Sequence, residues 1–431
     1  MRYTFLLLAV LLVALPSAAT TIVVDAAGGG DYSTVQGGVD AAVTGDTLLV
    51  RAGYYEENVI VPGPSLTWIG DGAGLTVISA SDPAPAIWLD MELPPGASSF
   101  SGFTVQAYAL DEVAVGWSEG GASFSDCDLI GSVGGGSAYG AIGLENCTAT
   151  HAHAGGGDRH SYVEDSSVGS LFISGVLVFG PGGATYWNPS SVSVENSTVG
   201  AVQLCAAGLS ATQSELGELS TMNEVGGCHL VDCEVGSIDL ASVDLDLIRC
   251  AVSGGVAMSG WFDHNSAHCG DVVLTETVVQ GDIDIHVDSS ADNPWLGLDI
   301  VHTTIDGGFG FTWSTFWGDF LIWPYCVQSN IFTGTANLPT RPEWYWPVVT
   351  HNDFVGEFTV PAGADTVYGN ISAEPLFCGV GDYTLEDCSP CVGAAHDGGD
   401  IGALGVGCAC QTLVEPMSWG AIKARYRQPP N

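Results

Sequence analysis

Five tryptophans in the C-terminal half of the chain have the chemistry of a carbohydrate-binding surface. They are Trp313, Trp317, Trp323, Trp344 and Trp346, and phenylalanines and tyrosines lie between them. Indole rings displayed along a surface stack on the apolar faces of sugar rings, because they offer a large contact area at a low entropy cost. The alternative is that the same rings pack over the edges of the core. The sequence leaves both interpretations open.

A group of carboxylates precedes the tryptophans and has the chemistry of a calcium site. Its members are Asp271, Asp282, Asp284 and Asp288. Calcium takes about six to eight oxygen ligands, many of them carboxylates. If these residues recur on neighbouring strands, they predict calcium as the cofactor. The alternative is that the acids only keep a lysine-poor protein soluble, or suit a salty habitat.

Histidines form a third candidate set. His151, His153 and His160 fall in a glycine-rich stretch and have the ligand type that transition metals prefer. The alternative is a solvated loop without a metal. A second metal candidate of this kind is the group Asp263, His264, His268 and Cys269.

The composition indicates which elements must position these residues. The chain has 59 glycines and a single lysine, Lys423, with 46% hydrophobic and 13% charged residues. Such a composition favours short strands and tight turns over amphipathic helices. No linker or low-complexity segment divides the chain. A repeat array can reach this length without a second core, because each repeat packs only on its neighbours.

A four-residue pattern recurs along the chain: a polar residue, then a small residue or cysteine, one further position, and an aliphatic or aromatic residue. Successive copies start 17 to 36 residues apart. This repeat predicts an all-β, right-handed parallel β-helix of about twelve coils, with loops inserted at the longer spacings. The copies start at Asp126, Asn146, Asp165, Asn196, Asp232, Arg249, Glu276, His302, Ser329 and His351.

The pattern assigns roles to its first two positions. Asn and Asp at a corner satisfy backbone groups there, and cysteine inside a stack behaves as a small hydrophobe. The cysteines on the second position are therefore expected to be buried free thiols, with disulfides as the alternative: Cys127, Cys147, Cys233 and Cys250. Three Asn-x-Ser/Thr sequons near corners are expected to be structural, with glycosylation as the alternative: Asn146, Asn196 and Asn370.

Both ends of this array resemble known sequences. The segments 31–36, 40–42, 45–50 and 53–57 resemble the first coils of the pectin-lyase-like superfamily and the start of pectin methylesterases, and the likeness continues in 70–72 and 76–78. The segments 350–354 and 375–405 resemble the closing coils of secreted bacterial right-handed β-helix repeat proteins. The resemblance covers about a third of the chain and implies the fold. It does not specify a reaction, because the superfamily holds lyases, hydrolases, esterases and adhesins.

Two stretches resemble enzyme motifs of that superfamily. Trp261-Phe262-Asp263-His264 is similar to a pectate lyase motif, which implies catalytic roles for Asp263, His264 and Arg341, with calcium bound by the aspartates that follow. The chain departs from that family, because no basic residue lies between Arg249 and Arg341. The segment 318–322 loosely resembles a pectin esterase motif, but Trp323 replaces its closing glycine.

The charge restricts the partners. The chain has 49 acidic and 8 basic residues and a formal net charge of −41. Such a field repels nucleic acid and disfavours a polyuronate such as pectate. An extracellular polysaccharide is the expected partner, and a neutral one is favoured over an anionic one.

The termini predict export. Residues 1–19 have the features of a secretory signal peptide, with an apolar run from Phe5 to Leu15 that is too short to span a bilayer. No later run approaches membrane length, so we expect no transmembrane segment. Residues 20–405 are assigned to the β-helix, and residues 406–431 to a cysteine-containing cap with a basic tail. The tail is either a helix on the acidic stack or a signal for surface attachment.

Two functions from different classes follow. The first is a secreted or cell-surface protein that binds extracellular polysaccharide without turnover. The second is a carbohydrate-active enzyme, either a calcium-dependent polysaccharide lyase or a pectin esterase. The first predicts binding alone, and the second predicts unsaturated or de-esterified products.

Overall fold

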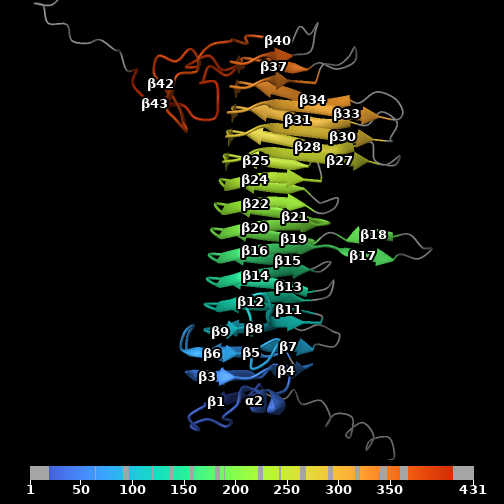
Figure 1. Ribbon diagram of the computed structural model, residues 1–431, viewed down its shortest axis with the longest axis vertical. Coiled ribbons are helices and arrows are strands. Elements are labelled where there is room, and N and C mark those ends of the chain that lie inside the picture. Colours follow the sequence, from blue (N-terminus) through green and yellow to red (C-terminus); the bar gives the residue numbers. More distant parts are fainter. Residues whose placement is uncertain are drawn as a thin grey trace, which may run out of the picture.

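The computed structural model is a tall stack of coils that rises from the N-terminal to the C-terminal part of the chain (Figure 1). The structure describes residues 19–63, 65–90, 97–118, 120–135, 140–155, 160–179, 185–188, 190–221, 227–241, 244–262, 268–289, 295–315, 321–339, 347–359 and 367–410.

Two long parallel sheets form the walls of the stack. Sheet A has 16 strands and sheet B has 22, and the strand pairs within both are parallel. Crossovers between parallel strands of one sheet are right-handed, so the chain is a right-handed parallel β-helix, as the sequence predicts.

The strands of sheet A are, in stacking order, β1 (Thr21–Val24), β2 (Thr47–Val50), β5 (Thr67–Gly70), β8 (Ala97–Ser101), β11 (Gly120–Ser125), β13 (Gly140–Glu145), β15 (His160–Glu164), β19 (Ser190–Glu195), β21 (Ala207–Thr212), β23 (Cys228–Val231), β25 (Leu245–Ile248), β28 (His268–Thr275), β31 (Trp295–Val301), β34 (Leu321–Gln328), β37 (Val348–Thr350) and β40 (Val367–Tyr368).

The strands of sheet B are β3 (Gly53–Glu56), β4 (Val59–Pro62), β6 (Thr76–Ser79), β7 (Ile87–Asp90), β9 (Thr104–Gln106), β10 (Val113–Trp117), β12 (Asp128–Gly135), β14 (Thr148–Gly155), β16 (Ser167–Ser174), β20 (Thr198–Cys205), β22 (Glu215–Thr221), β24 (Glu234–Leu240), β26 (Ala251–Val252), β27 (Val256–Phe262), β29 (Val278–Val279), β30 (Ile283–Ser289), β32 (Thr304–Ile305), β33 (Phe309–Thr315), β35 (Ile331–Phe332), β36 (Ala336–Asn337), β38 (Asp353–Phe354) and β39 (Phe358–Thr359).

The first position of the repeat is a left-handed corner between sheets A and B. Its φ lies between 48° and 59° from Asp126 to His351. Asn and Asp adopt this conformation readily, whereas Arg249 and Glu276 do not, so the stack imposes the corner. Gln213 also has φ 50° and starts a further copy of the pattern. The longest spacing expected, from Asn196 to Asp232, is therefore two coils.

The second position of the repeat forms a polar ladder inside the stack. In seven steps among the described residues, a backbone N–H at this position donates to a side-chain oxygen of the next coil, at 2.8 to 3.3 Å. These bonds satisfy buried donors that have no strand partner at the corner. The ladder contains Cys147, Ser166, Ser197, Ser214, Cys250, Thr277, Thr303, Asn330, Asn352 and Asn370. Asn370 of the third sequon is thus structural.

A second ladder, of glycines, bends sheet B within each coil. A Cβ at Gly200 would lie 2.5 Å from the carbonyl oxygen of Gly169 in the coil before it. The bend also allows long strands such as β16 to continue through it, so sheet B is continuous across the bend. The glycine ladder contains Gly169, Gly200, Gly217, Gly236, Gly254, Gly281, Gly307, Gly334 and Gly356.

Helix α2 (Val35–Ala41) closes the N-terminal end of the core (Figure 1). Thr34 caps it, and the Glu57 carboxylate accepts hydrogen bonds from the N–H groups of Val35 and Gln36 at 2.9 and 3.0 Å. The residues that resemble pectin methylesterases therefore have a structural role at this end. No helix among the described residues is long and apolar enough to cross a membrane.

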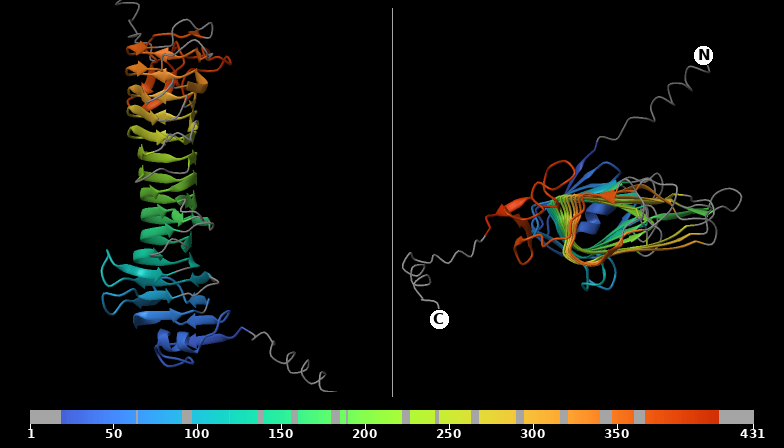
Figure 2. Two further views of the ribbon diagram at one scale, coloured as in Figure 1. Left: turned by 90° about the vertical axis from the view of Figure 1, so that its right-hand side faces the viewer. Right: turned by 90° about the horizontal axis from the view of Figure 1, so that it is seen from above.

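Residues 372–410, which we call the C-terminal unit, fold back along the side of the stack. The unit contains a three-stranded sheet of β41 (Phe377–Gly379), β42 (Asp382–Glu386) and β43 (Val406–Cys408). Seen along the stack, it lies on the side opposite the antiparallel hairpin β17 (Val176–Phe179) and β18 (Thr185–Asn188) (Figure 2). The Tyr383 hydroxyl donates to Asp306 at 2.6 Å, and the Gly402 N–H donates to the Ser329 carbonyl at 2.8 Å.

The cysteines follow the expected division with one exception. Cys127, Cys147, Cys233 and Cys250 are buried free thiols at the second position of the repeat, as expected. In the C-terminal unit, disulfides join Cys378 to Cys408 and Cys388 to Cys410. The fifth cysteine of that unit, Cys391, is a buried free thiol that lies 3.2 Å from the Asp353 carboxylate.

Candidate functional site

A concavity of about 450 Å³ lies on the outer face of sheet B. Three successive coils form it, through the start of β30, the start of β33 and the residues around β36. Its lining combines polar side chains with glycines and Phe309, and it contains no basic residue: Asp282, Asp284, Gly307, Gly308, Phe309, Gly310, Gly334, Thr335 and Asn337. We call this site the glycine notch.

Strand register sets the shape of the notch. Asp284 pairs with Gly310, which pairs with Asn337. Because strands in a sheet lie about 4.8 Å apart, the aspartate and the asparagine stand about 10 Å apart, with the glycine backbone low between them. Asp282 and Thr335 flank Gly308 in the same way. The notch therefore has a carboxylate wall, a glycine floor and a hydroxyl–amide wall.

The floor depends on the absence of side chains. A Cβ at position 310 would lie 2.6 Å from Oδ1 of Asp284, and the Gly308 N–H donates to Oδ1 of Asp282 at 2.6 Å. The carboxylates of Asp282 and Asp284 thus lean over the floor while both residues remain exposed. A carboxylate only accepts hydrogen bonds, whereas a threonine hydroxyl and an asparagine amide can each donate and accept them. This set matches the hydroxyls of a sugar.

The four predicted calcium ligands do not form one cage. Asp282 and Asp284 share the notch. Asp288 lies further along β30, with its Oδ2 3.3 Å from Nε2 of His286. Asp271 lies on β28 in the other sheet, against Gly297. One calcium ion bound by all four residues does not fit this arrangement, and only the Asp282–Asp284 pair could contribute to a shared site.

Trp313, the predicted sugar-stacking residue that the structure describes, packs rather than projects. It is half-buried against the core, with its ring centroid 5.9 Å from that of Phe311. In register it follows Val287, which is fully buried, so it lies on the inner side of β33. Trp317, Trp344 and Trp346 lie outside the described residues, as does the side chain of Trp323.

The predicted catalytic residues Asp263, His264 and Arg341 also lie outside the described residues. Both arginines that the structure describes are ion-paired. Arg51 lies 3.3 Å from Asp71, and Arg249 makes bonds of 2.6 and 2.8 Å to the two oxygens of Asp232. This pair holds the pKa of Asp232 below its usual value. Each guanidinium is thus paired with a carboxylate, while about half of each arginine side chain remains exposed.

The predicted histidine group is not a metal site. His151 and His153 lie on β14 rather than in a loop, and each ring bonds to a serine of the next coil, Ser170 at 2.7 Å and Ser174 at 3.2 Å. His160 lies on β15 in the other sheet. Burial lowers the pKa of His153 and favours its neutral form.

The sequence pattern does not identify two sets of residues that the structure brings together. Asp284, Gly310 and Asn337 come from successive coils, 26 and 27 residues apart, and only the register aligns them. A second set, His302, His396 and Asp397, brings three potential metal ligands within 4.8 Å of one another. Its signal in the sequence is the adjacent His396-Asp397 pair, while His302 fits the repeat only as a corner residue.

No protein-family model matches the chain, and no curated protein matches it in sequence. In structure the chain is similar to pectin methylesterase from carrot, at 15% identity and a TM-score of 0.26, over 52% of this chain and 84% of that one. It is also similar to the pectin methylesterase of Aspergillus niger, at 12% identity and a TM-score of 0.28, over 70% and 87% of the two chains. A third similar structure is pectate lyase Pel9A, at 12% identity and a TM-score of 0.24, over 91% and 97%. Similarity at this level carries no inference about activity, which has to come from the residues of this chain.

Proposed function

We propose that the protein is an extracellular β-helix protein that binds neutral polysaccharide without turnover, with one sugar residue held in the glycine notch. The observation that supports this most is the pairing of two walls across a bare backbone floor. Asp282 and Asp284 accept hydrogen bonds from sugar hydroxyls on one side, while Thr335 and Asn337 donate or accept on the other. The glycine floor lets the ring approach the sheet.

Charge supports a neutral ligand over a polyuronate. The notch has two carboxylates and no basic residue, and both described arginines are paired with aspartates. A sugar carboxylate placed there would lie beside like charges without a cation to offset them, within a protein of net charge −41.

Export is supported by chemistry as well as by the predicted signal peptide. Disulfides such as Cys378–Cys408 and Cys388–Cys410 form and persist in oxidising compartments. Surface attachment through the basic tail, residues 411–431, stays part of the proposal; this tail lies outside the described residues.

A glycan array followed by product analysis tests this function. We expect neutral polysaccharides to bind and polygalacturonate to bind more weakly. Any glycan that binds is then incubated with the protein, with and without calcium, and the products are examined for unsaturated, shortened or de-esterified sugars. Unchanged glycan supports a binding protein. Products of any of these kinds would replace the proposal by an enzyme of the corresponding class.

A further inference from the structure

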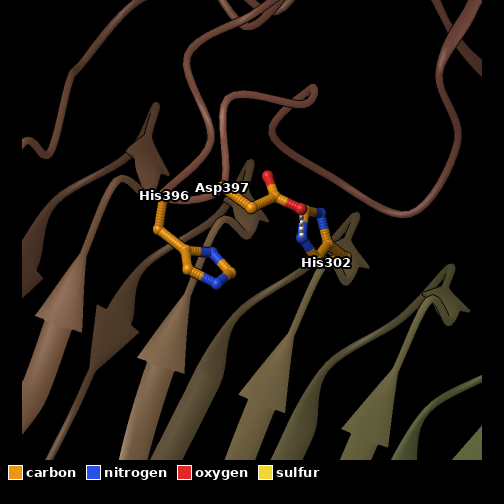
Figure 3. Close-up of side chains that lie close together, drawn as sticks. All are labelled: His302, His396 and Asp397. Carbon is orange, nitrogen blue, oxygen red and sulfur yellow. Dashed lines mark ion pairs between the residues drawn. The ribbon is translucent and has the colours of Figure 1, made fainter.

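We propose that His302, His396 and Asp397 bind a divalent transition-metal ion of the zinc class, which joins the C-terminal unit to the side of the stack. The three side chains converge from two elements that are far apart in sequence (Figure 3). His302 occupies a left-handed corner of the stack, and His396 and Asp397 belong to the C-terminal unit. The site shares no residue with the glycine notch.

The distances approach those of a metal site. Nε2 of His302 lies 3.5 Å from Oδ2 of Asp397, and the three ligand atoms all lie within 4.8 Å of one another. Ligands in a tetrahedral zinc site, at about 2.0 to 2.2 Å from the ion, lie about 3.3 Å apart. The His302–Asp397 pair already has this spacing. Small rotations of the His396 side chain, which is exposed, would complete three protein ligands.

Neighbouring groups orient two of the ligands. Nδ1 of His396 lies 2.8 Å from the Ser329 hydroxyl, and the same hydroxyl oxygen accepts the backbone N–H of His396 at 3.0 Å. When Nδ1–H donates to this oxygen, the lone pair of Nε2 is available to a metal. Such an outer partner is typical of metal-binding histidines. Oδ1 of Asp397 accepts the Gly399 N–H at 2.9 Å, which leaves Oδ2 facing His302.

Two imidazoles with one carboxylate form a typical zinc ligand set, with a water molecule in the fourth position. The strongly negative protein favours the approach of a cation.

The other group of three potential ligands among the described residues has only one ligand that is not in a disulfide, the Glu386 carboxylate. It consists of Glu386, Cys388 and Cys410, and its two sulfurs form a disulfide. The His302 group therefore keeps all three donors. His302 lies 94 residues before His396 and 95 before Asp397. An ion bound by all three would therefore link the C-terminal unit to the corner of the stack at His302. That unit already contacts the same coils through Ser329 and Thr304.

Zinc binding by the mature protein, prepared without a histidine tag, tests the proposal. The protein is stripped with a chelator, dialysed and titrated with zinc against a chromophoric competitor near pH 7.5. We expect one zinc ion per chain with a Kd in the micromolar range or below. His302→Ala and Asp397→Asn should each weaken binding by more than about tenfold, the loss expected even for an outer partner. His229→Ala is the matched control, because it removes another exposed His–Asp pair, 2.6 Å from Asp246, without a third ligand.

Amide hydrogen exchange gives a second readout. Zinc should slow exchange in residues 393–403 of the wild type, where the backbone N–H groups of His396 and Gly402 bond to Ser329. It should have no such effect in His302→Ala, whose retained fold is checked by circular dichroism. The proposal is overturned if the wild type does not bind zinc, or if His302→Ala binds zinc as tightly as His229→Ala does.

Discussion

Oδ1 of Asn352 accepts two hydrogen bonds from Asn330 of the preceding coil, one from the backbone N–H and one from the side-chain amide, both at 3.0 Å. Both side chains are fully buried. The Asn330 amide also donates to the Ile300 carbonyl at 2.7 Å, and its oxygen accepts the Thr303 N–H at 2.8 Å. One asparagine thus completes the hydrogen bonding of three coils at the corner.

Asn330→Ala should therefore lower the free energy of unfolding by about 2 kcal/mol or more, because it leaves a buried N–H and a buried carbonyl without partners. Urea unfolding followed by circular dichroism measures this change. Gln203→Ala, on the exposed face of β20, is the control and should change stability by less than about 0.5 kcal/mol. Equal effects of the two substitutions would contradict the role of the ladder.

The cysteine assignment predicts two separate chemical classes. Mass spectrometry of protein alkylated without reduction, after unfolding, should find Cys127, Cys147, Cys233 and Cys250 alkylated. Cys378 should be linked to Cys408, and Cys388 to Cys410. In the folded protein the four buried thiols should react slowly, because they are 1 to 3% exposed. A disulfide between any of those four would contradict the assignment.

The sequence was sufficient to predict the fold because each coil repeats the same local chemistry. Polar corner residues and small second residues recur at positions that the structure places one coil apart, so the pattern alone predicts the stack. Gln213-Ser214-Glu215-Leu216 also fits the pattern, so the sequence contains this copy as well, although it was not recognised as a coil. The glycine ladder was readable in principle, since Gly169 and Gly200 directly follow the aliphatic position of their copies.

The candidate sites could not be predicted in the same way. The notch depends on which residue of one coil lies beside which residue of the next, and loops of unequal length hide that register in the sequence. The C-terminal unit folds back onto coils that precede it by many residues, and only contacts such as Tyr383–Asp306 determine where it lies. Trp313 shows that residue type alone does not predict the position of a side chain, since an aromatic residue suits a binding face and a core equally well.

Asp353 predicts a pH-dependent stability difference. Burial raises its pKa, and it accepts from the Ala373 N–H at 2.9 Å beside the Cys391 thiol, whose own pKa burial raises to about 12. The folded state thus binds the Asp353 proton more tightly than the unfolded state does. The stability that this group contributes is present below the unfolded pKa, about 3.9, and is lost as pH rises from there through the raised folded pKa.

Asp353→Asn should remove this loss, so the Tm of the variant relative to the wild type should increase as pH rises through that window and then become constant. Thermal unfolding between about pH 3 and pH 8 measures the difference. Asp382→Asn is a control of opposite sign, because hydrogen bonds from Thr384 lower the pKa of Asp382. A difference between Asp353→Asn and the wild type that does not vary with pH would contradict the prediction.

Calcium and sodium should act at different concentrations if Asp282 and Asp284 share an ion. Screening of the net charge requires about 0.1 M monovalent salt, where the Debye length is about 10 Å. A specific calcium ion should raise the Tm at millimolar concentration or less in that salt background, and Asp282→Asn should abolish the effect. If calcium adds nothing over sodium at matched ionic strength, the aspartate pair does not bind calcium.

The most direct test of the account is the affinity of a neutral oligosaccharide, chosen from the array, for the wild type and two charge-matched variants. Asp284→Asn changes the carboxylate wall of the notch. Asp239→Asn makes the same change elsewhere on the outer face of sheet B. Asp239 pairs with Ala257, which pairs with Asp284, so it lies two coils before the notch. By isothermal titration calorimetry, we expect Asp284→Asn to weaken binding by about tenfold or more, the loss of one hydrogen bond to a charged group, while Asp239→Asn binds like the wild type. Equal affinities of the two variants, or a wild type that binds polygalacturonate more tightly than any neutral glycan, would contradict the account.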